Sequence, residues 1–150
     1  RFGFGGLLRT GLRLNADAVV ILDVVDGARA GTEISEAGFD PLALAHFYGS
    51  MLGVPVAEDS TGDWAQLAGD GPTLAFQRVV DHEPPRWPEG LPQQAHLDLA
   101  VDSYEAPHAL AISLGATPLD PVEPPTPSFT RGFRVYADPA GHPFCLCTCD

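Results

Sequence analysis

Residues 94–101 read QAHLDLAV, and the polar and apolar side chains of this segment alternate one by one. Successive side chains of a β-strand point to opposite faces of its sheet, so the alternation predicts a strand with one buried face. The apolar face carries Leu97, Leu99 and Val101, and the opposite face carries His96, Asp98 and Ala100. Such a strand needs a second layer over its apolar face, which the flanking segments must supply.

The segment before this strand predicts one round of elements. A weak strand candidate at 32–38 precedes a helix. Asp40 suits the N-cap of that helix, Pro41 its first turn and Gly53 its left-handed C-terminal residue. Three short strands are expected to follow, at 54–58, 64–67 and 73–80.

The same order of elements returns in the second half of the chain. The strand at 94–101 precedes a helix at 103–114 that Gly115 ends. Three further strands are expected, at 116–119, 129–136 and 142–148. This internal repeat predicts an α+β domain with helices on one face of its antiparallel strands and an open concavity on the other.

The repeat also divides the chain into regions. Residues 32–150 form the domain, with modules at about 32–80 and 94–150 and a proline-rich connector at 81–93. Residues 1–31 form an N-terminal extension, in which a β-branched run at 19–25 can add an extra strand with an apolar edge.

The charge of the chain narrows the range of partners. Its 150 residues include 20 acidic and 8 basic side chains, for a net charge of −12. A surface this negative repels phosphate backbones and anionic lipids, so neither a nucleic acid nor a membrane is an expected partner. No segment approaches the roughly 20 apolar residues of a membrane-spanning helix, and residues 1–8 do not read as a signal peptide.

The three cysteines, Cys145, Cys147 and Cys149, occupy alternate positions near the end of the chain. On an extended strand such neighbours cannot form a disulfide of good geometry. An odd cysteine count without a framework is typical of a reducing compartment, so we expect a cytoplasmic protein. Alternate side chains of a strand lie about 7 Å apart, which favours small apolar packing residues over a shared soft-metal site.

Three segments, in this order along the chain, carry a family resemblance: residues 45–53 (AHFYGSMLG), 96–102 (HLDLAVD) and 138–146 (DPAGHPFCL). Together they resemble the glyoxalase/bleomycin-resistance/dioxygenase, or vicinal oxygen chelate, superfamily over roughly residues 33–148. The PPRWP segment at 84–88 further resembles a bacterial glyoxalase-like subgroup. The resemblance implies two βαβββ modules that form a curved mixed sheet around a cup.

The resemblance also implies a metal site in that cup. Catalytic members place four inward-facing ligands, from the first and last strands of both halves, around one divalent ion with open positions for substrate. In this chain those positions fall on His96, on Cys145 in place of the usual Glu, on Glu33, and on Gln77 or Ala75. Because Gln is a poor ligand, the metal set reduces to His96, Glu33 and Cys145, and zinc is the favoured ion.

Other side chains of the expected cup suggest further roles. His96 and Asp98 are the candidate catalytic residues for acid/base chemistry without a metal, and His82 and His142 are further candidates. The ligand-binding candidates are His96, Gln77, Trp87 and Cys145. Phe133 and Trp64 could also line an apolar pocket, whereas alternation turns Phe76 toward the helices.

Two functions fit this sequence. The first is a glyoxalase-like small-molecule-binding protein with a degenerate metal site, which holds an apolar or aromatic metabolite or drug in its cup. The alternative is a metal-dependent lyase, isomerase or dioxygenase of the same superfamily, which needs at least three good inward-facing ligands. The family implies a homodimer in either case, because a second subunit commonly completes a half-open cup.

Overall fold

The computed structural model describes residues 13–14, 20–25, 40–69, 74–79, 85–90, 96–129 and 131–148. Within them it has eight strands and two helices: β1 (Arg13–Leu14), β2 (Val20–Val25), α1 (Pro41–Leu52), β3 (Trp64–Gln66), β4 (Leu74–Val79), β5 (Leu97–Ala100), α2 (Glu105–Ser113), β6 (Thr117–Asp120), β7 (Phe133–Ala137) and β8 (Pro143–Cys147). The predicted strand at 32–38 lies outside the described residues. None of the helices found in the described ranges is long and apolar enough to cross a membrane.

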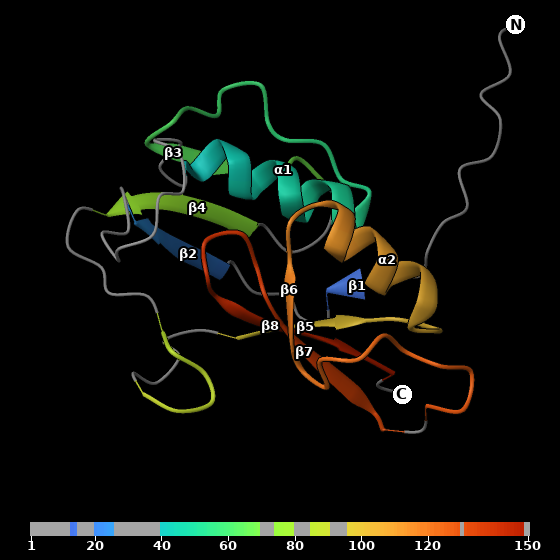
Figure 1. Cartoon of the computed structure of the whole chain (residues 1–150). Helices are drawn as coiled ribbons and strands as arrows, with labels where there is room; N and C mark the ends of the chain where they lie inside the picture. Colours follow the sequence, from blue (N-terminus) through green and yellow to red (C-terminus); the bar gives the residue numbers. More distant parts are fainter. Residues whose placement is uncertain are drawn as a thin grey trace, which may run out of the picture.

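The strands form two mixed sheets (Figure 1). One has the order β1-β5-β8-β7-β6 and the other has the order β2-β4-β3. Each sheet contains one parallel pair, β5 with β8 and β2 with β4, and its other neighbours are antiparallel. The predicted α+β class is therefore confirmed, and the second half shows the complete βαβββ order.

The first half repeats this arrangement, with β2 in the place that β5 has in the second half and without the strand predicted at 54–58. The strand at 19–25 was predicted, and as β2 it pairs parallel with β4, as β5 pairs with β8. The strand predicted at 54–58 is wrong: this segment makes only an isolated bridge between Val56 and Leu67. Pro55 has no backbone N–H to donate to a ladder, which explains why regular pairing does not extend through the segment.

The caps of α1 are those that the sequence predicts. Asp40 has an extended backbone, and its Oδ1 accepts a hydrogen bond from the backbone N–H of Leu42 at 2.6 Å. At the other end Gly53 has φ 68°, the left-handed conformation that glycine adopts without steric cost. The short polar side chain of Asp40 therefore fixes the start of this helix, and the flexible backbone of Gly53 fixes its end.

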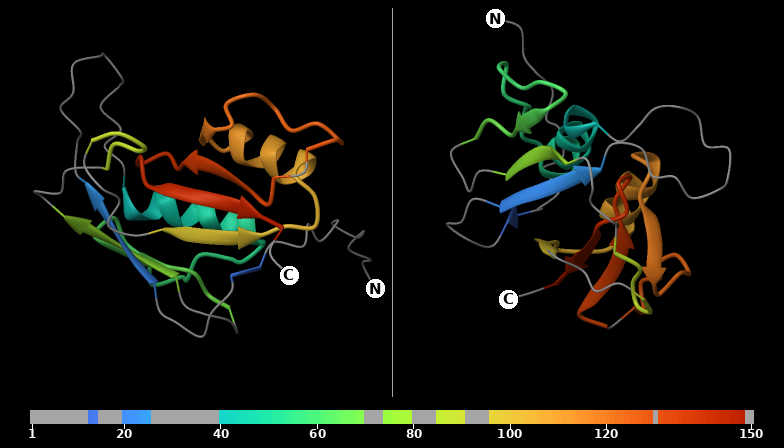
Figure 2. Two further views of the ribbon diagram at one scale, coloured as in Figure 1. Left: turned by 90° about the horizontal axis from the view of Figure 1, so that it is seen from below. Right: turned by 90° about the vertical axis from the view of Figure 1, so that its left-hand side faces the viewer.

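Helix α1 lies along both sheets (Figure 2), and its aromatic side chains contact residues of each sheet. The ring of Tyr48 stacks on Phe76 of β4, with centroids 5.6 Å apart, and meets Phe144 of β8 edge-on at 6.0 Å. Phe47 contacts the same Phe144 ring, with centroids 5.7 Å apart. All four side chains are buried. One helix thus covers apolar residues of both sheets, and Phe76 faces it as its alternation predicted.

A buried polar contact joins α1 to the β7–β8 hairpin. The Tyr48 hydroxyl donates to Asp138 Oδ2 at 2.9 Å, and Asp138 Oδ1 accepts the backbone N–H groups of Ala140 and His142. His142 Nδ1 lies 3.2 Å from the same carboxylate. His142 is therefore a buried residue of the hairpin, and its role in acid/base chemistry stays a prediction.

We expect Tyr48→Phe to lower the free energy of unfolding by about 1–2 kcal/mol, because the substitution deprives a buried carboxylate of one donor and leaves the ring packing intact. Urea denaturation measures this change. Ser50→Ala, at an exposed position of the same helix, is the control and should change stability by less than about 0.5 kcal/mol. A Tyr48→Phe variant as stable as the control would show that the hydrogen bond does not secure the hairpin.

Candidate functional site

The parallel pairing of β5 with β8 builds the candidate site. In this ladder Leu97 lies opposite Phe144, and Asp98 lies opposite Cys145. Leu97 and Leu99 are buried, as the alternation of residues 94–101 predicts. The opposite face of the same strands carries Asp98 and Cys145, and His96 lies two residues before Asp98.

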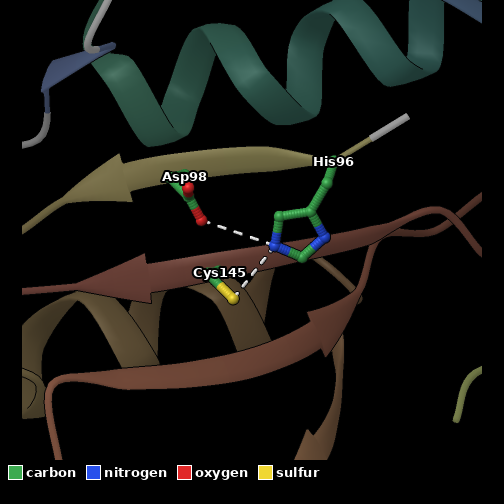
Figure 3. A group of neighbouring side chains, drawn as sticks. All are labelled: His96, Asp98 and Cys145. Atoms are coloured by element: carbon green, nitrogen blue, oxygen red, sulfur yellow. Dashed lines mark hydrogen bonds and ion pairs between the residues drawn. The ribbon is translucent and has the colours of Figure 1, made fainter. Parts of the chain in front are cut away.

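Three side chains converge on that face, which looks away from α1 and α2 (Figure 3). His96 Nε2 lies 3.1 Å from Cys145 Sγ and 3.4 Å from Asp98 Oδ1. One donor atom from each residue lies within 4.8 Å of the other two. The side chains of His96 and Asp98 are 27% and 62% exposed, whereas Cys145 is buried. The cluster is therefore closed on the sulfur side and open toward solvent on the carboxylate side.

The surroundings of Cys145 favour its neutral thiol. Burial raises the pKa of the thiol from 9.0 to about 12, and the negative charge of Asp98, which also accepts a hydrogen bond from the thiol, contributes to the rise. The positive charge of Arg131 lowers the pKa and opposes these effects. In the absence of a cation, Cys145 therefore stays protonated at neutral pH.

This geometry argues against a thiol nucleophile. In a Cys–His–carboxylate triad the carboxylate orients the histidine through the ring nitrogen that does not face the nucleophile. Here Asp98 and Cys145 lie near the same nitrogen, His96 Nε2. A nucleophilic cysteine also needs a lowered pKa, whereas the pKa of Cys145 is raised. Three donor atoms around one point are instead the arrangement of a metal site.

The structure brings together some of the predicted site residues and not others. His96, Asp98 and Cys145 lie together, and Asp98 joins them as a potential ligand, a role that the sequence analysis did not consider for it. The spacing His96-x-Asp98 on one strand face is the signal that could have shown it. Gln77 is exposed on β4, in the other sheet, and its ligand-binding role stays a prediction.

Two other candidates stay predictions. Trp87 is half-buried in the connector. Glu33 lies outside the described residues, as does His82. Of the aromatic candidates, Phe133 and Trp64 are exposed, and Phe76 is buried against α1.

Cys147 corrects the prediction for the cysteines. Cys145 is a free thiol, but Cys147 is disulfide-bonded. The geometric argument against pairing assumed an extended strand throughout, and β8 ends at Cys147. Beyond that residue the argument no longer applies, and the cysteine pattern stops being a reason to expect a reducing compartment.

Two of the hollows on the described part of the chain do not include the cluster. One, of about 510 Å³, lies beside α1 and is lined by His46, Gly49, Ser50, Gly53, Val54, Pro55 and Val56. The other, of about 450 Å³, lies at the start of α2 and is lined by Asp102, Ser103, Tyr104, Glu105, Thr126, Pro127, Phe129, Arg131 and Thr148. The second hollow matters here because Arg131 is also electrostatically coupled to Cys145.

Comparisons with known proteins add family information. The model of a glyoxalase-like domain family matches residues 37–147, most of the chain. No curated protein shows a significant match.

Solved structures match at the level of the fold. A glyoxalase/bleomycin resistance protein/dioxygenase family enzyme from Burkholderia phytofirmans is 16% identical, with a TM-score of 0.54 over 84% of this chain and 94% of that one. A glyoxalase-related enzyme from Fulvimarina pelagi is 19% identical, with a TM-score of 0.55 over 89% of this chain and 88% of that one.

A third match is a mutant of the fosfomycin resistance protein FosX from Listeria monocytogenes, in complex with Mn(II) and 1S,2S-dihydroxypropylphosphonic acid. It is 14% identical, with a TM-score of 0.54 over 91% of this chain and 90% of that one.

In metal-free protein we expect iodoacetamide to alkylate Cys145 slowly at about pH 8, because a thiol with a raised pKa forms little thiolate. Asp98→Asn removes a negative charge beside the sulfur, lowers the pKa of the thiol and should accelerate labelling several-fold. Mass spectrometry of the peptide containing Cys145 measures the rate. Asp102→Asn, at an exposed carboxylate nearby in sequence, should leave it unchanged. Equal rates in the Asp98→Asn variant and the parent protein would contradict this electrostatic explanation of the raised pKa.

Proposed function

The chain belongs to the glyoxalase-like domain family, and we propose that it binds a small molecule at a divalent metal ion held by His96, Asp98 and Cys145. The observation that carries this proposal is the convergence of one nitrogen, one oxygen and one sulfur donor on a single sheet face. Asp98 and Cys145 come from two parallel strands whose backbone ladder fixes their positions, and His96 directly precedes the first of these strands.

The donor separations suit a bound ion. Ligand atoms lie about 2.0–2.3 Å from zinc, so neighbouring ligand atoms lie roughly 3–4 Å from one another. His96 Nε2 lies 3.1 Å from Cys145 Sγ and 3.4 Å from Asp98 Oδ1, within that range. Small side-chain rotations about these positions suffice to place all three donors around one ion.

The donor types favour zinc over harder ions. A thiolate is a soft ligand, an imidazole suits zinc, and a carboxylate completes a mixed set. Magnesium and calcium prefer sites made of oxygen alone. The neutral thiol must lose its proton on binding, so the affinity for metal should rise with pH.

Each residue has a distinct part in this proposal. Cys145 anchors the ion on the buried side, and His96 fixes it from the start of β5. Asp98, the most exposed of the three, lies on the side from which a ligand would approach. A bound ion would supply Lewis-acid polarisation of a carbonyl or hydroxyl oxygen, the chemistry on which a lyase, isomerase or dioxygenase of this superfamily depends.

The Mn(II) complex of FosX gives this proposal outside support. That protein shares the fold of this chain and is bound to a metal ion and a small phosphonic acid. In this chain the three donors belong to the second half, and Glu33, the metal candidate of the first half, lies outside the described residues. We propose that a second copy of the chain, in a homodimer, covers the open side of the site.

A metal-free binding protein is the second candidate. Phe133 exposes its ring on the sheet face that carries Cys145, and an exposed aromatic ring suits an apolar or aromatic ligand. In this version His96 and Asp98 act as hydrogen-bonding or acid/base groups. The two candidates differ in whether the cluster retains a metal ion.

We expect the chelator-treated protein to bind about one zinc ion per chain, and zinc at a hundred times its Kd to stabilise the fold by about 2.7 kcal/mol. His96→Ala and Cys145→Ala should each weaken binding by more than about tenfold. With cobalt in place of zinc, Cys145→Ala should also abolish the thiolate-to-cobalt charge-transfer band. Equilibrium dialysis with metal analysis and absorption spectroscopy measure these effects.

The matched control for this experiment is His46→Ala, which removes an exposed histidine on α1 and should leave zinc affinity unchanged. Light scattering of the same samples gives the mass for comparison with the 15.9 kDa chain, and a dimer has twice that value. If zinc, cobalt, nickel and manganese all fail to bind, or bind equally well to both cluster variants, the metal proposal is wrong and the metal-free candidate takes its place.

A further inference from the structure

The sheet face that carries the cluster also carries a charged group, Arg131, which the sequence analysis did not consider. Arg131 lies just before β7, and its guanidinium carbon lies 4.2 Å from the centroid of the Phe133 ring. Phe133 pairs with Cys147, and Val135 pairs with Cys145. Residues directly opposite in an antiparallel ladder share a face, so Phe133 and Cys145 lie on the same side of the sheet.

The distance along this face is set by the strands. Val135 is the direct partner of Cys145, and Phe133 is two residues further along β7, a separation of roughly 7 Å. The guanidinium of Arg131 lies over the Phe133 ring at that end. The effect of the Arg131 charge on the pKa of Cys145 agrees with this proximity.

The guanidinium is held in place and is still accessible. Arg131 forms an ion pair with Asp120 of β6, in which Nη2 of the arginine lies 2.8 Å from Oδ2 of the carboxylate. The side chains of Arg131 and Asp120 are 41% and 38% exposed. A guanidinium has five N–H donors in a planar fork, so one carboxylate partner orients it without using all its donors.

We propose that Arg131 determines the substrate class of this site: a small organic anion with metal-binding oxygens at one end and a carboxylate at the other. The oxygens are bound at the cluster, the apolar middle of the molecule lies on Phe133, and the distal carboxylate is bound by Arg131. The inference rests on the proposed function, because it assumes that the ligand reaches the metal cluster.

A guanidinium binds a carboxylate through charge-assisted hydrogen bonds and is the side chain best suited to do so in a planar, bidentate manner. An exposed aromatic ring between two polar ends suits a short aliphatic chain. The chain has a net charge of −12, and the cation on this face attracts an anion to that position.

A pair of matched probes tests the inference. 2-Oxoadipate and 2-oxohexanoate share the 2-oxo acid end and the three methylene groups, and they differ only in a terminal carboxylate or methyl group. Isothermal titration calorimetry on zinc-loaded protein should show 2-oxoadipate binding about tenfold more tightly or better, the size expected for a charge-assisted hydrogen bond. Zinc content after each titration shows whether the probe has removed the ion.

Variants assign the preference to Arg131. Arg131→Gln should abolish the preference for 2-oxoadipate and leave the affinity for 2-oxohexanoate unchanged, with both measured at saturating zinc because the charge of Arg131 also lowers the pKa of Cys145. Arg131→Lys should restore part of the preference, because it keeps the charge and loses the planar fork. Arg78→Gln is the matched control: it breaks an Arg–Asp pair with Asp63 on the other sheet, and it should keep the full preference.

The outcomes separate this inference from the proposed function. Equal affinity for both probes, no binding of either probe, or a preference that survives in Arg131→Gln would overturn the inference while zinc binding still stands. If zinc does not bind but metal-free protein prefers 2-oxoadipate in an Arg131-dependent way, the proposed metal site fails and the assignment of Arg131 is supported.

Discussion

The parallel ladder between β5 and β8 is the constraint on which the candidate site depends. Its register places Asp98 directly opposite Cys145, and the alternation of β5 places His96 on the same face. Backbone hydrogen bonds fix both strands, so the three donor atoms lie close together before any ligand arrives. A site assembled on neighbouring strands is held more rigidly than one assembled on loops.

The other face of the same ladder explains why the donors face outward. Leu97, Leu99, Phe144 and Leu146 are buried on that face. Phe144 is in contact with Phe47 and Tyr48 of α1, and the same Tyr48 ring stacks on Phe76 of the three-stranded sheet. A shift of one residue in the register of β5 or β8 would expose this apolar face and bury the polar groups of the other face. The core therefore determines the side on which the site is built.

The buried contact between Tyr48 and Asp138 extends this dependence to the hairpin that precedes β8, because the Tyr48 hydroxyl connects that carboxylate to α1. Burial and the neighbouring carboxylate raise the pKa of Tyr48 well above its usual value, so the hydroxyl keeps its proton and donates.

Sequence patterns could predict the elements whose signals are local. Alternation in residues 94–101 indicated the faces of β5, and Asp40 with Gly53 indicated the ends of α1. The strand expected at 54–58 failed because hydrophobic pattern does not reveal a missing N–H at Pro55 within the ladder. The burial of His142 could not be predicted either, because it depends on Tyr48, ninety residues away from Asp138, packing onto the Asp138 carboxylate.

The candidate site shows the same division. His96 and Cys145 were predicted from the strand positions that the family resemblance implies. The spacing His96-x-Asp98 indicates that Asp98 shares the face of His96, whereas its place opposite Cys145 follows only from the register of β5 with β8. Arg131 could not be placed by any periodicity, because it precedes β7 and its position depends on Asp120 and Phe133.

X-ray absorption at the zinc edge is the sharpest test of the proposed metal site, because it reports which atoms surround the ion. We expect one sulfur neighbour at about 2.3 Å, together with nitrogen and oxygen neighbours at about 2.0–2.2 Å. The sulfur contribution should disappear in the Cys145→Ala variant. A coordination shell without sulfur in the parent protein, or a sulfur signal that persists in that variant, would contradict a site built from His96, Asp98 and Cys145.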